Sequence, residues 1–239
     1  MSMKIRKFII TRHECPTNEI CRIWLKSQKG DDIFDFTAGQ FIILHDLNEA
    51  GESIFSRSYS IASPPYLSKE MIELGIKSQG KMSGKLYSAK PGDVFGVQGP
   101  YGAFKLSDSK HTVLFAGGIG VTPIRSMIFE SLKNNPQKEL ILFYSGRSLN
   151  DLIFHKEFKK LSDDNVNFKY IPIITRDIPK DWIYEAQRFD QDMLKKYVKD
   201  LNDDMDFIMC GPMEMMNSVK KTLEAIGVDV KAKLRAESY

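Results

Sequence analysis

The sequence predicts two domains, an antiparallel β-barrel followed by an α/β domain with a doubly wound parallel sheet. About the first hundred residues form short strand-like runs between turn residues, a spacing typical of a small antiparallel barrel. After about Leu106, apolar strands alternate with helical segments, which is typical of a parallel sheet covered by helices. A chain of 239 residues suits two modest domains. We expect the boundary near residues 107–109, giving domains 1–108 and 109–239.

The strands predicted for the first domain are rich in β-branched and aromatic residues. Gly-Asp, Ala-Gly, Pro-Pro and Pro-Gly-Asp steps separate them and provide the turns. We therefore expect strands at 7–11, 20–25, 41–44, 58–61 and 71–76.

The second domain is predicted to begin with a strand at 111–116, a near-continuous apolar run of the kind that is buried on both faces of a sheet. A helix follows at 122–134, with Thr122 as its N-cap and Pro123 as its first helical residue. The same alternation then predicts strands at 139–145, 166–174 and 206–210 and helices at 150–161, 190–199 and 212–226.

Composition narrows the function classes. The chain is 42% hydrophobic and 27% charged, with a net charge of +3, which is too small to indicate nucleic-acid binding. No apolar run approaches the roughly 18 residues of a membrane span. The N-terminus lacks the apolar core of a signal peptide, so we expect a cytoplasmic protein.

The three cysteines, Cys15, Cys21 and Cys210, are too few for a four-cysteine iron–sulfur cluster. His13 lies close to two of them in the sequence, but no second ligand pair follows at the spacing of a zinc site. We therefore predict no metal. An odd cysteine count without a secretory signal fits a reducing compartment.

Two short segments carry the chemistry. Residues 57–60, Arg-Ser-Tyr-Ser, combine a guanidinium, an aromatic ring and two hydroxyls. Residues 117–123, Gly-Gly-Ile-Gly-Val-Thr-Pro, form a glycine turn between a strand and a helix, a backbone geometry that holds a pyrophosphate. An isolated Arg-x-Tyr-Ser is more simply a core tyrosine beside a surface arginine, but Gly80, Ser83 and Leu86 downstream favour a flavin site. Together they predict two phosphate-bearing cofactors.

The next two strand ends bear on the choice of nicotinamide cofactor. NAD sites usually carry an acid at the end of the second strand, where it binds the ribose hydroxyls. Here these ends read Ser-Gly-Arg up to Arg147 and Thr-Arg at Thr175 and Arg176, which favours the 2′-phosphate of NADP and leaves NAD possible. The nearby Asp151 is explained as an early helix residue that the helix dipole favours.

Five motifs occur in order along nearly the whole chain: residues 55–61, 80–83 with Leu86, 99–102, 117–123 and 210–212. This ordered set resembles the ferredoxin–NADP reductase superfamily. The resemblance implies FAD rather than FMN. It also implies that Tyr59 stacks on the isoalloxazine, that Ser60 hydrogen-bonds near N5 and that Arg57 neutralises the pyrophosphate. The further cofactor-binding residues expected are Ser58, Gly75, Ile76, Lys77, Gly80, Lys81, Met82 and Ser83 for the flavin, and Gly117, Gly118, Gly120, Val121, Thr122, Pro123, Gly146, Arg147, Thr175, Arg176, Cys210, Gly211 and Pro212 for the nicotinamide nucleotide.

The C-terminal Glu-Ser-Tyr resembles the end of plant-type reductases, whose terminal aromatic residue covers the flavin face that the nicotinamide must reach. The resemblance implies that Ser60, Cys210, Glu237 and Tyr239 surround the path of the hydride, and that Tyr239 also contacts the flavin. The plain alternative is a frayed terminus.

The predicted function is an FAD-dependent oxidoreductase that exchanges electrons between NADPH and an acidic carrier, ferredoxin or flavodoxin. The alternatives are a free-flavin or quinone reductase and an electron-transfer subunit of a larger oxidoreductase or oxygenase complex. Residues 77–105 carry five lysines against one acid. This stretch is either a landing patch for the acidic carrier or an ordinary solvated surface.

Overall fold

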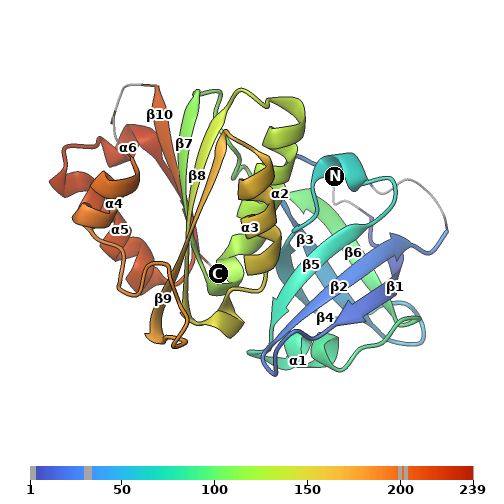
Figure 1. Cartoon of the computed structure of the whole chain (residues 1–239). Coiled ribbons are helices and arrows are strands. Elements are labelled where there is room, and N and C mark those ends of the chain that lie inside the picture. The colour runs from blue at the N-terminus through green and yellow to red at the C-terminus, as the bar shows by residue number, and fades with distance from the viewer. Residues whose placement is uncertain (1–3, 30–33, 199–200, 202–203, 239) are drawn as a thin grey trace. The chain divides into compact units, whose positions relative to one another are not determined.

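The computed structural model describes residues 4–29, 34–198, 201 and 204–238. They fall into two compact units: Met1–Lys105 with Arg125–Glu130, and Leu106–Ile124 with Ser131–Tyr239. Figure 1 traces the chain through both units. The first unit is built on an antiparallel sheet and the second on a parallel sheet with helices, so the predicted fold class is confirmed. The predicted limits 1–108 and 109–239 stay predictions.

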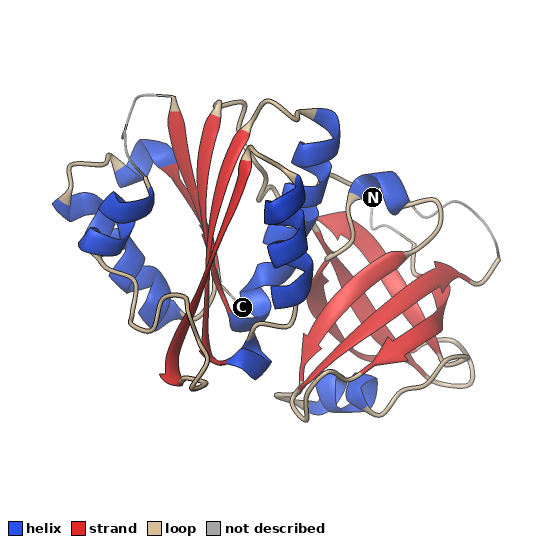
Figure 2. Cartoon of the chain, viewed as in Figure 1, coloured by secondary structure: helices blue, strands red, loops and turns tan. Residues whose placement is uncertain are grey.

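The first unit is a six-stranded antiparallel barrel (Figure 2). Its strands follow the order β4-β3-β6-β1-β2-β5. An antiparallel bridge between Ile61 and Leu74 joins the end of β4 to β5, so the two edges of the sheet close on each other. The strands are β1 Arg6–Glu14, β2 Ile20–Ser27, β3 Phe41–Leu47, β4 Ser53–Ser60, β5 Ile72–Lys77 and β6 Val94–Tyr101.

Alternation along the strands builds the core of the barrel. Phe8 and Ile10 in β1 and Ile42 and Leu44 in β3 are all buried, because every second side chain of a strand points to the same face. A buried carboxylate lies in the same unit. Glu73 is 3% exposed, and its two oxygens contact Arg22 at 2.6 Å and Arg125 at 3.1 Å.

Two strands of the barrel depart from the sequence prediction. Strand β6 was not predicted, since Gly96, Gly99 and Pro100 interrupt its apolar pattern. Strand β4 begins at Ser53 rather than at residue 58. It is an edge strand of the sheet, and its side chains are exposed or only partly buried, so alternation does not mark its start. A short helix, α1, spans Lys81–Tyr87, and a 3-10 turn spans Pro65–Leu67.

The second unit is a five-stranded parallel sheet in the order β11-β10-β7-β8-β9. Helices α4 and α5 cover one face of the sheet and α3 covers the other (Figure 1). The strands are β7 His111–Gly117, β8 Glu139–Ser148, β9 Phe168–Asp177, β10 Met205–Cys210 and β11 Leu234–Glu237. The helices are α2 Val121–Asn134, α3 His155–Asp164, α4 Gln191–Tyr197, α5 Met213–Ala225 and α6 Val230–Lys233.

The start of α2 differs from the prediction. The helix begins at Val121 after a 3-10 turn, Gly118–Gly120, and Gly120 occupies the N-cap position. Thr122 is therefore not the N-cap: it is the second helical residue, and its hydroxyl donates to the carbonyl of Ile119 at 3.0 Å. Pro123 is the third rather than the first helical residue. It is tolerated there because the N–H groups of the first turn have no partner within the helix.

Other boundaries were also misjudged. The helix predicted at 150–161 is a 3-10 turn, Leu149–Asp151, followed by α3 from His155, because Ser148 and Asp151 close the turn as a capping box. Helix α6 and strand β11 were not predicted, since four residues each are too few to show a period. In the described part of the chain no helix has the length and apolar character needed to cross a membrane.

Candidate functional site

The carboxyl ends of β7 and β10 meet backbone to backbone. A Cβ on Gly120 would lie 2.5 Å from the carbonyl oxygen of Cys210, and one on Gly211 would lie 3.0 Å from the nitrogen of Gly117. A Cβ on Gly117 would lie 2.6 Å from the sulfur of Met215. Gly120 and Gly211 are required because a side chain at either would meet the backbone of the other strand end, whereas one at Gly117 would meet the side chains of Pro212 and Met215. The start of α2 is thereby held at the edge of a parallel sheet where nucleotides bind.

Gly118 has another task in the same turn. Its φ of +52° lies in the left-handed region, which glycine adopts without strain. The neighbouring Val121 is fully buried, so its side chain is core and only its backbone can reach a ligand. The predicted nucleotide-binding turn therefore presents backbone rather than side chains. Its glycines allow both the close packing of the strand ends and the shape of the loop.

Cys210 and Glu237 end two neighbouring strands and are paired in register. The thiol is 4% exposed, and burial, with a further contribution from the charge of Glu237, raises the pKa of Cys210 to about 12. Burial also raises the pKa of Glu237. The Oε2 atom of Glu237 is buried, and no described residue hydrogen-bonds to it. A buried acceptor without a donor at the end of a parallel strand fits a polar ligand.

The ends of β8 and β9 present two exposed arginines, Arg147 and Arg176. The other polar groups there are engaged by the fold. Thr175 donates its hydroxyl to the carbonyl of Gly146 at 3.1 Å, and a carboxylate oxygen of Asp151 accepts the N–H of Arg147 at 2.9 Å. Asp151 is the third residue of the 3-10 turn, and its side chain stabilises that turn as part of a capping box with Ser148.

Two further residues near this edge bear on the prediction. Pro212, after Gly211, is exposed and precedes the first residue of α5. Arg188, a further arginine of the α/β unit, forms an ion pair with Glu214 at 2.7 Å. Arg147 and Arg176 remain exposed at adjacent strand ends, as the predicted 2′-phosphate site requires.

The flavin motif lies on β4. The strand runs without a break through Ser60, so neighbouring side chains alternate between its faces. Arg57 and Ser58 are exposed, whereas Tyr59 and Ser60 are partly buried. Tyr59 packs against the barrel core, and burial raises its pKa to about 12, with Cys21 raising it and Arg57 lowering it by smaller amounts. The ring is thus held in place while the guanidinium faces solvent.

The loop before α1 is organised by Ser83. Its hydroxyl accepts the N–H of Gln79 at 2.9 Å and donates to the carbonyl of Gly80 at 3.1 Å. Lys81 places its ammonium 4.6 Å from the centre of the Phe55 ring, so the start of α1 lies beside β4. A Cβ on Gly80 would meet nothing within 4 Å. The backbone here is open, as the predicted pyrophosphate cradle requires.

The remaining residues predicted to bind the flavin are Gly75, Ile76, Lys77 and Met82, and most of them have no free side chain to contact a ligand. Met82 is 2% exposed and Ile76 is fully buried, so their side chains belong to the barrel core. Gly75 is buried as well, and it pairs with Arg22 across the sheet. The ammonium of Lys77 lies 3.5 Å from a carboxylate oxygen of Glu19.

Of the four residues expected along the hydride path, the structure brings Cys210 and Glu237 together. Ser60 belongs to the other unit, and Tyr239 lies outside the described residues. Their shared role stays a prediction. The sequence analysis considered His13 with Cys15 and Cys21 and predicted no metal there, and the structure places the ligand atoms of these three residues within 4.8 Å of one another.

Comparison with known proteins identifies both units. Residues 7–106 match the family model of the oxidoreductase FAD-binding domain, and residues 114–221 match that of the oxidoreductase NAD-binding domain. The chain is 34% identical over 189 residues to the F subunit of the Na(+)-translocating NADH-quinone reductase of Marinomonas sp. (strain MWYL1), covering 72% of this chain and 46% of the relative. The corresponding protein of Klebsiella pneumoniae is 31% identical over 189 residues, covering 72% of this chain and 46% of the relative. The chain spans about half the length of these relatives.

Solved structures share the fold. The cytochrome b5 reductase domain of Ulva prolifera nitrate reductase superposes with a TM-score of 0.85 at 19% identity, covering 98% of this chain and 97% of that one. A ferredoxin NADP+ reductase from Neisseria gonorrhoeae with bound FAD and NADP gives a TM-score of 0.80 at 22% identity, covering 98% of both chains.

Proposed function

The chain belongs to the ferredoxin–NADP reductase superfamily, with an FAD-binding and an NAD-binding oxidoreductase domain, and we propose that it carries electrons from a reduced nicotinamide nucleotide to another protein. FAD and a nicotinamide dinucleotide are its cofactors, as the sequence predicted. When bound, FAD accepts a hydride and releases the electrons singly. The observation that carries the proposal is the pairing of the buried Cys210 with Glu237, whose Oε2 atom is buried without a donor among the described residues, at the carboxyl edge of the parallel sheet beside the glycine turn.

Each part of the site has a proposed task. Arg57 binds the flavin pyrophosphate, Tyr59 supports the ring system, and the backbone at 80–83 cradles the phosphates. Glu237 holds or moves a proton at Oε2, since burial raises its pKa and favours the protonated form at a higher pH than for an exposed glutamate. Cys210 excludes water beside it, because its buried thiol remains neutral. Ser60 hydrogen-bonds the flavin from the barrel side.

We propose NADPH as the preferred donor. Arg147 and Arg176 are exposed at adjacent strand ends, which supports this choice. Asp151, the acidic residue that follows the first of these ends, accepts hydrogen bonds from the backbone of its own turn. An exposed guanidinium matches a phosphate better than a ribose hydroxyl. NADH is the competing donor, since the relatives named above belong to NADH-quinone reductases.

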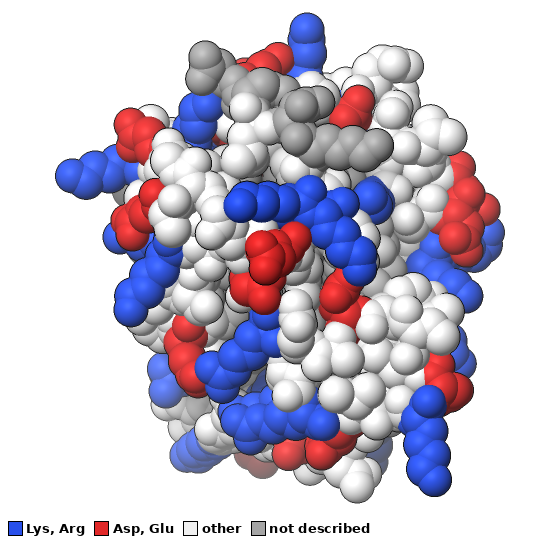
Figure 3. Space-filling view, turned by 60° about the vertical axis from the view of Figure 1, so that its left-hand side comes forward, with Lys and Arg blue, Asp and Glu red and all other residues white. Residues whose placement is uncertain are grey.

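The identity of the electron acceptor is inferred from the surface charge of the barrel and from the relatives. Of the five lysines between residues 77 and 105, Lys77 and Lys85 contact Glu19 and Asp46. On the face drawn in Figure 3, basic and acidic side chains are interspersed. Because Lys77 and Lys85 contact acidic side chains, the lysine stretch offers less net charge for an acidic carrier than its composition suggests. We keep ferredoxin or flavodoxin as the first candidate. The second is a neighbouring protein of a larger complex, which the relatives from the Na(+)-translocating NADH-quinone reductase favour.

Anaerobic stopped-flow spectroscopy tests the proposal. Purified protein should release FAD on denaturation, without iron, and either nucleotide should bleach the flavin absorption, NADPH faster. Steady-state assays with ferredoxin, flavodoxin, free FMN and a quinone then rank the acceptors. A protein that binds no FAD, or whose FAD neither nucleotide reduces, contradicts the proposed function; fast reduction of free FMN or quinone alone identifies a reductase with a diffusible acceptor.

Tyr239 has a separate test. If its ring occupies the nicotinamide site, Tyr239→Ser should tighten NADP+ binding and increase the use of NADH, because the competing stacked ring is gone. Titration of the oxidised variant with NADP+ measures this. An affinity equal to that of the wild type would leave the terminal residue without a role, as expected of a frayed end.

A further inference from the structure

A thiol–imidazole cluster lies in the barrel, away from the predicted cofactor motifs in sequence. It follows from the pairing of β1 with β2, in which His13 faces Ile23 and Glu14 faces Arg22. The next residues along the same register are Cys15 and Cys21. Because side chains alternate along a strand, His13 and Cys15 share a face, and Cys21 lies opposite them on that face.

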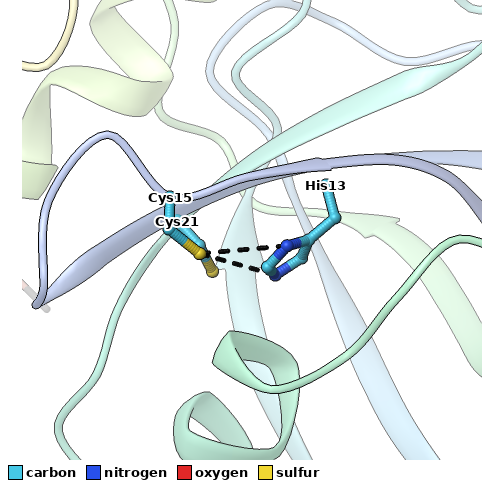
Figure 4. A group of neighbouring side chains, drawn as sticks. All are labelled: His13, Cys15 and Cys21. Atoms are coloured by element: carbon cyan, nitrogen blue, oxygen red, sulfur yellow. Dashed lines mark hydrogen bonds between the residues drawn. The ribbon is translucent and has the colours of Figure 1, made fainter.

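The side chains converge as this register requires. Figure 4 shows both cysteines and the imidazole pointing toward one another. The Sγ atom of Cys15 lies 3.8 Å from Nδ1 and 3.9 Å from Nε2 of His13, and all three ligand atoms lie within 4.8 Å. Cys21 is fully buried, whereas Cys15 is exposed. The cluster therefore has a buried floor and an open side.

The imidazole is oriented by the backbone of α1. Nε2 of His13 lies 3.0 Å from the carbonyl oxygen of Leu86, an acceptor that requires Nε2 to carry the proton. Nδ1 then keeps a free lone pair. The Cys15 sulfur lies 3.8 Å from Nδ1 and 3.9 Å from Nε2, so the exposed Cys15 side chain must rotate to share an ion with that lone pair. A metal-binding histidine commonly donates its second nitrogen to a carbonyl in this manner, which fixes both the tautomer and the ring plane.

We propose that His13, Cys15 and Cys21 bind a single soft cation, with Zn²⁺ as the ion of reference. Two thiolates and an imidazole are the donors that select Zn²⁺ or Cu⁺ over hard cations. Tetrahedral zinc, with its usual bond lengths, separates two sulfurs by about 3.8 Å and a sulfur from a nitrogen by about 3.6 Å. The observed 3.8 Å between the Cys15 sulfur and Nδ1 of His13 is close to this separation in length, and rotation of the exposed Cys15 side chain supplies the direction. Water can fill the fourth position on the open side.

The site links β1 and β2, which carry His13 and Cys21, to β5 and α1. Cys21 pairs with Ile76 of β5, and Leu86, which orients His13, lies in α1 after the predicted phosphate cradle. The cation displaces the proton of the Cys21 thiol when it binds, as metal binding to cysteine requires. A cation that binds only the folded chain raises its thermal stability by mass action. The inference does not depend on the proposed function.

The test uses the full-length, FAD-loaded protein after treatment with a chelator and a reductant. Competition with a chromophoric chelator should show one Zn²⁺ per chain, and Zn²⁺ should raise the melting temperature. Cys15→Ser, at an exposed position, should weaken Zn²⁺ binding by roughly a hundredfold or more, since loss of an outer-shell partner alone weakens metal sites by 10–100-fold. His13→Gln should also weaken it. The matched control is the third cysteine, and Cys210→Ser should leave the Zn²⁺ affinity unchanged.

Several outcomes overturn the proposal. One is a wild type that takes up no Zn²⁺ in competition, and another is a Cys210→Ser variant that loses as much affinity as Cys15→Ser. Titration with Cu⁺ in place of Zn²⁺ distinguishes the two soft ions at the same donors. A thiol count that falls from three to one in air, with no metal uptake by the reduced protein, would identify Cys15 and Cys21 as a disulfide pair instead.

Discussion

Each of the two units contains a glutamate with a buried carboxylate oxygen, and the two differ in whether that oxygen has a partner among the described residues. In the barrel, Glu73 is 3% exposed, accepts a hydrogen bond from Nε of Arg22 at 2.7 Å and faces Arg125 at 3.1 Å. In the α/β unit, Glu237 has a buried Oε2 to which no described residue donates, and burial raises its pKa. Both oxygens of Glu73 have arginine partners, whereas Oε2 of Glu237 has no hydrogen-bond donor among the described residues.

The difference separates structural groups from candidate functional groups. Leaving a buried polar atom unpaired destabilises a fold, so such atoms are rare and cluster where a ligand or substrate supplies the partner. The same contrast applies to glycines, since Gly120 is enclosed by backbone whereas Gly80 faces open space. It also applies to arginines, since Arg188 is paired with Glu214 whereas Arg176 is exposed at a strand end.

The largest effect is expected at the satisfied carboxylate. Glu73→Ala removes a carboxylate that contacts the buried Arg125 and should lower the free energy of unfolding by about 3–5 kcal/mol. Urea unfolding followed by far-ultraviolet circular dichroism measures the loss. Glu237→Ala, at the open carboxylate, serves as control and should lower it far less. Equal losses in the two variants would remove the distinction between the two sites.

A glycine pair sharpens the contrast further. Gly80 and Gly120 both occupy N-cap positions, so replacement by alanine affects helix capping similarly. Only at Gly120 does the new Cβ meet backbone, at 2.5 Å from the Cys210 oxygen. Gly120→Ala should therefore destabilise the protein by about 1–3 kcal/mol more than Gly80→Ala, the usual range for overpacking.

Ligand titrations complete this test. Gly80→Ala should fold normally and lose FAD affinity, because the methyl group enters the predicted cradle. Gly120→Ala should lose affinity for the nicotinamide nucleotide along with stability. If Gly80→Ala proves the less stable of the two, the close approach of β7 and β10 has been overestimated.

The arginines provide the third test. Arg176→Ala should raise the KM for NADPH by about tenfold or more while barely changing that for NADH, since a charge-assisted hydrogen bond contributes roughly 1.5–3 kcal/mol. Arg147→Ala should act in the same direction but less strongly. Arg188→Ala removes an arginine already paired with Glu214 and is the matched control. Parallel losses for both nucleotides would show that these side chains do not read a 2′-phosphate.

The smallest effect concerns pH. Burial raises the pKa of Glu237 above its ordinary value of 4.5, so the folded state binds the proton more tightly than the unfolded state. Its contribution to stability is present below about pH 4.5 and is lost as the pH rises through the raised value. Glu237→Gln should therefore be slightly more stable than the wild type at neutral pH, with the difference vanishing in acid. Thermal melts across this pH range measure it, and a difference that grows in acid would reverse the assigned sign.

Patterned segments were well predicted, and segments without a pattern were not. The apolar run at 111–116 became β7, His111–Gly117, because a strand buried on both faces is marked by its own residues. Strand β11, Leu234–Glu237, has only four residues and forms because it pairs with β10. Four residues are too few to show the alternation that would have predicted a strand. The capping box of Ser148 and Asp151 moved the start of α3 to His155.

The sequence by itself determined the alternation of strands and helices from β7 to α5, the two-domain fold class and the cofactor classes. These rest on local periodicity and on short motifs, such as Arg-Ser-Tyr-Ser and the glycine turn, in which neighbouring residues act together.

The tertiary structure decided which groups are satisfied and which remain open. It gave Glu73 its arginines, enclosed Gly120, left Oε2 of Glu237 without a donor among the described residues and brought His13, Cys15 and Cys21 within 4.8 Å. Each of these depends on strand register and on contacts between residues distant in sequence. A one-residue slip of register turns every side chain of a strand to the opposite face, so only the folded chain settles which groups meet.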